Sequence, residues 1–214
     1  MKSSSLEIWE EMARKPVGGY KEGLDSEKKF LIENLSEDEK VLDIGSGFGR
    51  VLEVLSPKVK EIIGIDNDEE AVKESVKLNE NNKKVKVLLM DAENLEFSDG
   101  EFGIVTCLGG TPSNFGKTRN KIYSEIKRVL KKKGLFFCSV YNEDALKDRV
   151  NYYEKYYSGK YTLNKETGYV EVKDKFVSEQ FSQDQMKNIL NENGFEVLKT
   201  IKAGVLNIFL SRSK

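Results

Sequence analysis

The 214-residue sequence contains no histidine, the usual general base near neutral pH and a frequent zinc ligand. Histidine-dependent triads and histidine–zinc centres are therefore excluded. The only two cysteines, Cys107 and Cys138, lie in separate apolar stretches, so we expect reduced thiols, a cytoplasmic protein and no metal site. No apolar run approaches the roughly 20 residues of a membrane-spanning helix, and we predict no membrane insertion.

An excess of charge of either sign is also missing, because 35 basic residues oppose 36 acidic ones for a net charge of −1. Nucleic-acid-binding surfaces are basic, so this balance argues against a nucleic-acid partner. Hydrophobic residues make up 38% of the chain, which favours a folded globule over a disordered chain. The length suits one domain, and the composition predicts nothing about the oligomeric state.

Short apolar runs alternate with helical patterns from Val41 onward, which is typical of βα units that build a mostly parallel sheet. We predict a core at residues 41–141 with an amphipathic helix around Ile122 and Ile126. The five strands expected in this core are 41–44, 61–65, 85–90, 102–108 and 135–141.

Residues 1–40 are predicted as an N-terminal helical segment. Ser4 opens a capping-box pattern for a helix that ends before Pro16. The Gly-Gly pair at 18–19 indicates a break, and a second helix is expected from near Ser26.

The pattern changes again after the fifth strand. Residues 142–181 are rich in tyrosine and charge, with two possible short strands, and are predicted as an inserted cap. Regular structure is expected to resume at Ser182, because Ser182 and Gln185 form a capping box ahead of a helix, and residues 182–214 are predicted to complete the core. Two final apolar runs, separated by three residues, are expected to pair as an antiparallel hairpin.

The first strand leads into the glycine-rich turn Asp43-Ile44-Gly45-Ser46-Gly47-Phe48-Gly49, which opens a helix. Glycines at 45, 47 and 49 remove Cβ atoms that would block a nucleotide-like ligand from the backbone, and the helix start offers free N–H groups. A purely structural glycine turn is the alternative interpretation of this pattern.

Acidic residues follow the next two strands. Asp66 lies 17 residues after Gly49, near the spacing at which an acidic side chain accepts ribose hydroxyls. The alternative is that Asp66 or Asp68 caps the following helix, and we favour Asp68 for the cap. Asp91 could be a plain turn residue, but it joins Gly45, Asp66 and Gly109 at strand ends, where open α/β sheets bind ligands.

These residues resemble the motifs of class I S-adenosylmethionine-dependent methyltransferases. The turn at 43–49 is similar to the first motif, Ile63-Gly64-Ile65-Asp66-Asn67 to the second, Met90-Asp91-Ala92 to the third and 102–110 to the fourth. Gly103 departs from the fourth motif, in which an acidic residue is common at this position.

The resemblance implies a Rossmann-like three-layer α/β sandwich, with a mostly parallel seven-stranded sheet and an antiparallel C-terminal hairpin. It also implies S-adenosyl-L-methionine as cofactor, with the Asp91 side chain and the next backbone amide on the adenine. The cofactor-binding residues expected from it are Asp43, Gly45, Ser46, Gly47, Gly49, Asp66, Asn67, Asp91, Ala92, Leu108 and Gly109.

Asp43 also distinguishes this cofactor from a dinucleotide. A carboxylate two residues before the first glycine would repel the pyrophosphate of NAD, whereas it attracts the ammonium and sulfonium of S-adenosylmethionine. The spacing Gly-x-Gly-x-Gly departs from the dinucleotide pattern as well. We therefore predict a methyltransferase and keep an NAD-dependent dehydrogenase as the alternative that this carboxylate argues against.

The acceptor is expected to be a small molecule that is methylated on nitrogen or oxygen. The catalytic residue is unknown, and the candidates are Asn114 after the fourth strand and Tyr141 at the end of the fifth. Seven of the nine tyrosines fall between Tyr141 and Tyr169, where they could enclose an acceptor or pack the cap onto the sheet.

An RNA or protein methyltransferase and a catalytically silent cofactor-binding subunit remain alternative functions. The run Lys131-Lys132-Lys133 could contact RNA, but the pattern places it at a helix end, where cations meet the helix dipole favourably.

Overall fold

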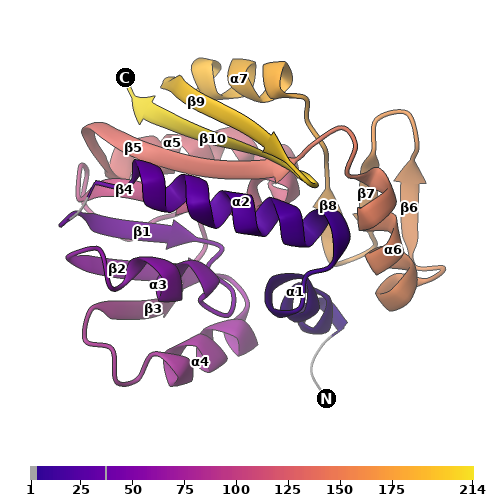
Figure 1. Cartoon of the computed structure of the whole chain (residues 1–214), viewed down its shortest axis with the longest axis horizontal. Coiled ribbons are helices and arrows are strands. Elements are labelled where there is room, and N and C mark those ends of the chain that lie inside the picture. Colours follow the sequence, from indigo (N-terminus) through magenta and orange to yellow (C-terminus); the bar gives the residue numbers. More distant parts are fainter. Residues whose placement is uncertain (1–3, 37) are drawn as a thin grey trace.

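A computed structural model of the chain describes residues 4–36 and 38–214. Its centre is a seven-stranded sheet in the order β3-β2-β1-β4-β5-β10-β9 (Figure 1). The five strands β1 to β5 run parallel, and β10 pairs antiparallel with both β5 and β9. The strands of this sheet are β1 (Lys40–Ile44), β2 (Glu61–Asp66), β3 (Val85–Leu89), β4 (Phe102–Cys107), β5 (Leu130–Tyr141), β9 (Phe195–Ala203) and β10 (Leu206–Ser213).

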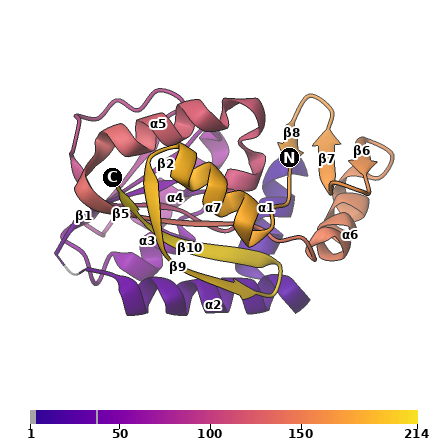
Figure 2. The ribbon, with the colours of Figure 1, turned by 90° about the horizontal axis from the view of Figure 1, so that it is seen from above.

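Helices on both faces make three layers, with α2 (Gly18–Asn34) and α3 (Arg50–Leu55) on one side and α5 (Arg119–Val129) and α7 (Gln183–Glu192) on the other (Figure 2). Successive side chains of a strand point to opposite faces. Thus Val41 packs with residues of α2 and α3, whereas Leu42 packs with residues of α5 and α7. Burial on both faces explains the continuous apolar runs, and the predicted Rossmann-like sandwich is confirmed.

The N-terminal segment corrects one expectation. Helix α1 (Ser4–Arg14) ends before Pro16 as predicted, although the Ser4 side chain lies outside the described part of the chain. Helix α2, however, begins at Gly18 and not near Ser26. A Cβ at Gly19 would lie 2.8 Å from Val205 Cγ1, so this glycine permits close helix packing and does not break the chain.

Residues 142–181 hold α6 (Leu146–Tyr157) and a three-stranded antiparallel sheet, where two strands were expected. Its strands are β6 (Tyr161–Asn164), β7 (Tyr169–Val172) and β8 (Phe176–Ser178). The segment lies beside the end of the main sheet near α1 (Figures 1 and 2). It then returns to the core through Ser182 and Gln185, whose predicted capping box at the start of α7 is confirmed.

The three lysines at 131–133 do not end a helix. Helix α5 ends at Val129, and Leu130 already pairs with Phe102 of β4, so the lysines belong to β5. Lys131 Nζ lies 2.8 Å from Glu39 Oε2. A Cβ at Gly103 would overlap this Glu39 carboxylate, so an acidic side chain at position 103 has no room here.

Within the described ranges, no helix combines the length and apolar character needed to cross a bilayer.

Candidate functional site

A cavity of about 1110 Å³ opens at the carboxyl ends of the parallel strands. The glycine turn after β1 and the ends of β2, β3 and β4 line one part of it. Residues of α1, α2, β5, the 3₁₀ turn Thr111–Asn114 and the 142–181 segment line another. The two parts are called the strand-tip end and the aromatic end below. The first is where open α/β sheets bind their ligands.

Hydrogen bonds to β2 hold the glycine turn in place. The backbone N–H groups of Gly45 and Ser46 both donate to the Ile65 carbonyl oxygen at 2.9 Å. Gly45 has φ +71°, and a Cβ there would lie 2.5 Å from Thr111 Cγ2. Gly47 has φ +49° and open space where a Cβ would point. A side chain at either position would strain the turn, and the open space at Gly47 lets a ligand approach the backbone.

Gly49 is the one predicted cofactor-binding residue that does not line the cavity. It has φ +86° as the residue before α3, and a Cβ there would lie 2.9 Å from Ser75 Oγ. Ser75 belongs to α4 (Glu69–Leu78), so Gly49 permits close packing between α3 and α4.

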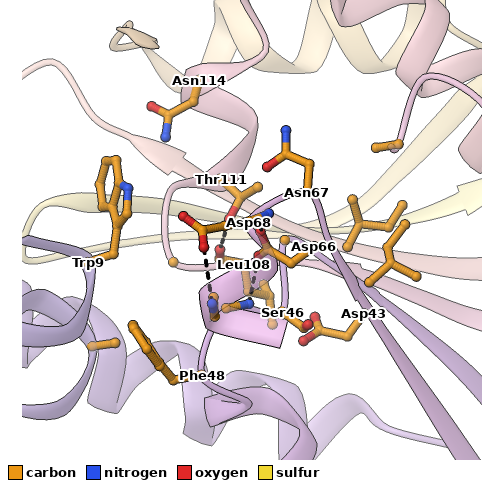
Figure 3. A pocket seen from close by; sticks show the side chains of 18 of the residues that line it. Trp9, Asp43, Ser46, Phe48, Asp66, Asn67, Asp68, Leu108, Thr111 and Asn114 are labelled. Atoms are coloured by element: carbon orange, nitrogen blue, oxygen red, sulfur yellow. Dashed lines mark hydrogen bonds between the residues drawn. The ribbon is translucent and has the colours of Figure 1, made fainter. Parts of the chain in front are cut away.

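Asp66 and Asp68 have separate roles. The Asp66 carboxylate accepts hydrogen bonds from the backbone N–H groups of Gly47 at 2.8 Å and Asp68 at 3.0 Å (Figure 3). Asp68 caps α4 by accepting from the N–H groups of Glu70 and Ala71. Asp66 is therefore not needed as the cap, and its carboxylate stands at the cavity wall with further lone pairs for hydroxyl donors. Burial raises the pKa of Asp66, opposed by these N–H groups.

Asp43 is a buried carboxylate with one oxygen left unpaired. Its side chain is 1% exposed, and Oδ1 accepts from Thr106 Oγ1 at 2.6 Å. Oδ2 is buried without a hydrogen-bond partner. Burial raises the pKa of Asp43 from its ordinary 3.8 to about 7, which the Thr106 hydrogen bond opposes. An unpaired buried carboxylate oxygen is costly, and a cationic ligand would compensate it.

Other predicted residues complete the strand-tip end. Met90 N donates to the Asp66 carbonyl oxygen at 3.0 Å, which joins the ends of β2 and β3. Asp91 is exposed and accepts from Glu93 N at 2.9 Å, as in a local turn. The remaining predicted residues that line the cavity are Ser46, Asn67, Ala92, Leu108 and Gly109.

Sequence analysis missed Glu27, a carboxylate of α2 that is 1% exposed. It accepts hydrogen bonds from Arg50 Nη2 at 2.6 Å, Gly109 N at 2.8 Å and Ser139 Oγ at 2.5 Å. Glu27 thus ties the helix after the glycine turn to the loop after β4. A signal was available, because residue 27 continues the apolar face formed by Tyr20, Leu24 and Leu31 at helical spacing.

The aromatic end contains both catalytic candidates, Asn114 and Tyr141, together with side chains that the sequence did not single out. Trp9 of α1 faces Phe176 of β8 with ring centroids 5.1 Å apart. Tyr20 of α2 meets Tyr141 edge to face at 5.9 Å. Asn114 and Trp9 lie at the same end of the pocket, away from Asp43 (Figure 3).

The tyrosines of residues 142–181 do not line this cavity. Tyr152, Tyr153 and Tyr157 are buried in the main hydrophobic cluster, which supports the packing alternative over an enclosure for the acceptor. The segment reaches the cavity through Asp174, Lys175 and Phe176 instead.

Comparison with known proteins identifies the core. Residues 42–138 match the family model described as a methyltransferase domain. The core of the chain is thus similar to a methyltransferase domain. The glycine turn, Asp66 and Asp91 all fall inside the matched region, so the resemblance noted from the sequence is confirmed.

Relatives of this methyltransferase domain are remote in sequence and close in fold. The uncharacterized methyltransferase YcgJ of Bacillus subtilis is 34% identical over 119 residues, which are 55% of this chain and 46% of YcgJ. The chain spans about half the length of the curated relatives it matches, between 46% and 64%.

Two solved structures share the fold at low identity. The PH0226 protein of Pyrococcus horikoshii aligns over 100% of both chains with a TM-score of 0.77 and 18% identity. The 1,6-didemethyltoxoflavin-N1-methyltransferase of Burkholderia thailandensis, solved with that compound and S-adenosylhomocysteine, covers 90% of this chain and 78% of its own. Its TM-score is 0.70 and its identity 16%.

The strand-tip end fits the cofactor of this methyltransferase domain. Asp43 offers an unpaired oxygen to a cation, Gly47 opens the backbone, and Asp66 and Asp91 supply carboxylates at successive strand ends. Among residues 4–36 and 38–214, no group of three or more metal-ligating side chains occurs.

Proposed function

We propose that the protein transfers a methyl group from S-adenosylmethionine to a small-molecule acceptor. The observation that carries the cofactor assignment is the buried, unpaired oxygen of Asp43 beside a glycine turn. This carboxylate would attract the ammonium of the methionine part and would repel a pyrophosphate at the same place. The matched methyltransferase domain points to the same cofactor.

Different residues would bind different parts of the cofactor. Asp66 would accept the ribose hydroxyls, and the Asp91 side chain with the Ala92 N–H would bind the adenine. The turn at Gly45 to Gly47 would hold the methionine part near Asp43. When bound, the cofactor supplies an electrophilic methyl carbon on a sulfonium, and the protein's task is to align an acceptor with it.

Three observations support a small acceptor. The cavity volume of about 1110 Å³ exceeds the ~300–1,000 Å³ of common ligand pockets, which leaves room for a second molecule beside a cofactor. Helix α1 and the 142–181 segment meet over the aromatic end through Trp9 and Phe176. The related Burkholderia enzyme is named for a small heterocyclic substrate.

The lysines at 131–133 give little support to RNA as the acceptor. None of them lines the cavity. Lys131 is paired with Glu39 directly before β1, at the amino ends of the strands and away from the cavity.

The test is a thermal-shift measurement with S-adenosylhomocysteine and NAD, since a ligand that binds only the folded protein raises its melting temperature. We expect stabilisation by S-adenosylhomocysteine and none by NAD. Transfer of a labelled methyl group to small-molecule extracts but not to bulk RNA or protein would complete the assignment. Stabilisation by NAD alone would refute it.

A further inference from the structure

Two polar atoms at the aromatic end of the cavity are buried without a partner. Asn114 Oδ1 has no hydrogen-bond partner, and neither has the hydroxyl of Tyr20, a residue 3% exposed whose ring meets that of Tyr141. Both residues line the cavity. Unsatisfied buried polar atoms are rare because each is costly, and at a cavity wall a ligand is the natural partner.

The two residues are connected through Tyr141. Its ring meets the Tyr20 ring at 5.9 Å, and its backbone N–H donates to Ser113 Oγ at 2.9 Å, directly before Asn114. Ser113 is fully buried and fixes this strand end, so it is a structural residue. Asn114 itself ends a short 3₁₀ turn, Thr111–Asn114, which is preceded by Gly110 at φ +86°. The backbone that carries the amide is thus held by the 3₁₀ turn and by the hydrogen bond between Ser113 and Tyr141.

Among the described residues at this end, neither the two phenols nor Asp174 is suited to remove a proton from an acceptor, and the Lys175 ammonium lies 5.7 Å from the centroid of the Tyr157 ring. Burial raises the pKa of Tyr20 and of Tyr141 well above 10, so both phenols stay neutral. Asp174 is exposed at the tip of the β7–β8 hairpin. Asp43, with its pKa of about 7, is committed to the cofactor under the function proposed above.

Because the described phenols and Asp174 are unsuited as bases, a nitrogen acceptor is favoured over an oxygen acceptor. An alcohol must lose its proton during methylation, whereas a neutral amine attacks through its lone pair without prior deprotonation. The N–H groups of an amine also need hydrogen-bond acceptors, which the Asn114 carbonyl and a tyrosine hydroxyl supply. Trp9, Tyr141 and Phe176 supply aromatic walls for a flat molecule.

We propose that the acceptor atom is the nitrogen of a flat amine that is neutral near pH 7, such as an arylamine or heteroaryl amine, with its N–H groups held by Asn114 Oδ1 and the Tyr20 hydroxyl. This inference rests on the proposed methyltransferase function. The amine lone pair forms the new N–C bond, and the electron pair of the breaking C–S bond stays on sulfur. The products are S-adenosylhomocysteine and an N-methylammonium, which releases its proton to water after it leaves.

The first experiment compares matched nitrogen and oxygen compounds on the wild-type protein saturated with S-adenosylhomocysteine. Aniline with phenol, 1-naphthylamine with 1-naphthol, and 2-aminobenzamide with 2-hydroxybenzamide form the panel. We expect further stabilisation in the thermal shift by at least one amine and less by its oxygen partner. With S-adenosylmethionine, the methyl label should appear on the same amine.

The second experiment uses Tyr20→Phe and Asn114→Leu, which remove the polar atoms and keep the bulk. For the amine that binds best, we expect kcat/KM to fall about 10- to 100-fold, as for a lost hydrogen bond of about 1.4–2.7 kcal/mol. The dissociation constant for S-adenosylhomocysteine should stay unchanged. Tyr152→Phe is the matched control, because its hydroxyl is also buried without a partner and its ring meets Tyr20 at 5.0 Å, yet it does not line the cavity.

The outcomes separate the two proposals. Failure of S-adenosylhomocysteine to bind overturns the methyltransferase function itself. Cofactor binding combined with no stabilisation by any amine, equal stabilisation by both members of each pair, or equal effects of Tyr20→Phe and Tyr152→Phe overturns only the nitrogen acceptor.

Discussion

The strand-tip end and the aromatic end of the cavity are built in different ways. At the strand-tip end, Asp43, Asp66 and Asp91 each belong to or follow a parallel strand, and the sheet brings the three together. At the aromatic end, Trp9 comes from α1, Tyr20 from α2 and Phe176 from β8, which are separate elements of the chain. The first end is encoded by local motifs, and the second arises only from tertiary packing.

Glu27 joins α3, the loop after β4 and β5 behind the cavity wall, and its loss should give the largest effect. Glu27→Ala leaves the Arg50 guanidinium, the Gly109 N–H and the Ser139 hydroxyl without their shared acceptor. We expect the free energy of unfolding to fall by about 3 kcal/mol, measured by urea denaturation. Glu33→Ala on the same helix is the control, because Glu33 is 58% exposed and its loss should cost under about 0.5 kcal/mol. Equal losses would contradict the role of Glu27.

Gly45→Ala should weaken cofactor binding at the strand-tip end, in addition to the stability that its backbone strain costs. The new Cβ would lie 2.5 Å from Thr111 Cγ2 at a backbone φ of +71°. We expect S-adenosylhomocysteine to bind about 10- to 100-fold more weakly in calorimetry, as strain of ~1–3 kcal/mol implies.

Gly159→Ala is the control that separates the effect of backbone strain from that of the steric contact at Gly45. Gly159 has the same φ of +71°, but a Cβ there would meet nothing within 4 Å, and the residue does not line the cavity. This control should lose stability through backbone strain and keep its cofactor affinity. A matching loss of affinity at Gly159 would show that strain alone explains the effect at Gly45.

The raised pKa of Asp43 predicts how pH acts on the strand-tip end. The ammonium of S-adenosylhomocysteine is attracted by the ionised carboxylate and much less by the neutral acid, so affinity for this ligand should weaken as pH falls below about 7, by at most about tenfold per pH unit. In the free protein, the native state binds this proton more tightly than the unfolded chain. The contribution of Asp43 to stability therefore falls as pH rises from about 4 to 7.

Asp43→Asn checks both effects. The variant should lose the pH dependence of binding between about pH 5.5 and 7, and above pH 7 its free form should be at least as stable as wild type, because a buried charge is gone. Calorimetry across this range measures the first effect and urea denaturation the second. A binding slope that persists in Asp43→Asn would assign the titration to another group.

The smallest effect is expected from the tyrosines of the 142–181 segment. Tyr157→Phe removes a buried hydroxyl that has no partner and does not line the cavity. Stability should change by under about 1 kcal/mol, with turnover of a methyl acceptor unaffected. A tenfold loss of turnover would show instead that these tyrosines contribute to the acceptor site.

The sequence predicted the parallel sheet, the C-terminal hairpin and the α7 capping box because each depends on local periodicity or a fixed spacing. It misplaced the start of α2, since a glycine that allows close contact with Val205 looks the same as one that breaks a helix. It also assigned the wrong position to the lysines at 131–133, because strand pairing at Leu130 begins directly after α5.

In the site, too, the residues that local sequence motifs indicate were predicted, and those that tertiary packing brings in were missed. Cofactor candidates followed from strand ends, and only Gly49 lies outside the cavity wall. The cavity-lining positions of Trp9 and Tyr20 could not be predicted, because their local sequence does not indicate which cavity α1 and α2 will cover. Glu27 was detectable as a charge on an apolar helix face, although its partners Gly109 and Ser139 were not.

The central claim is that carboxylates at successive strand ends bind a phosphate-free, cationic nucleoside. Calorimetric titration of the wild-type protein with S-adenosylmethionine, and with NAD in parallel, tests it most directly. We predict a single site for S-adenosylmethionine, weakened at least tenfold in Asp66→Ala, and no heat of binding with NAD. Binding of NAD at this site, or no binding of S-adenosylmethionine, would contradict the account.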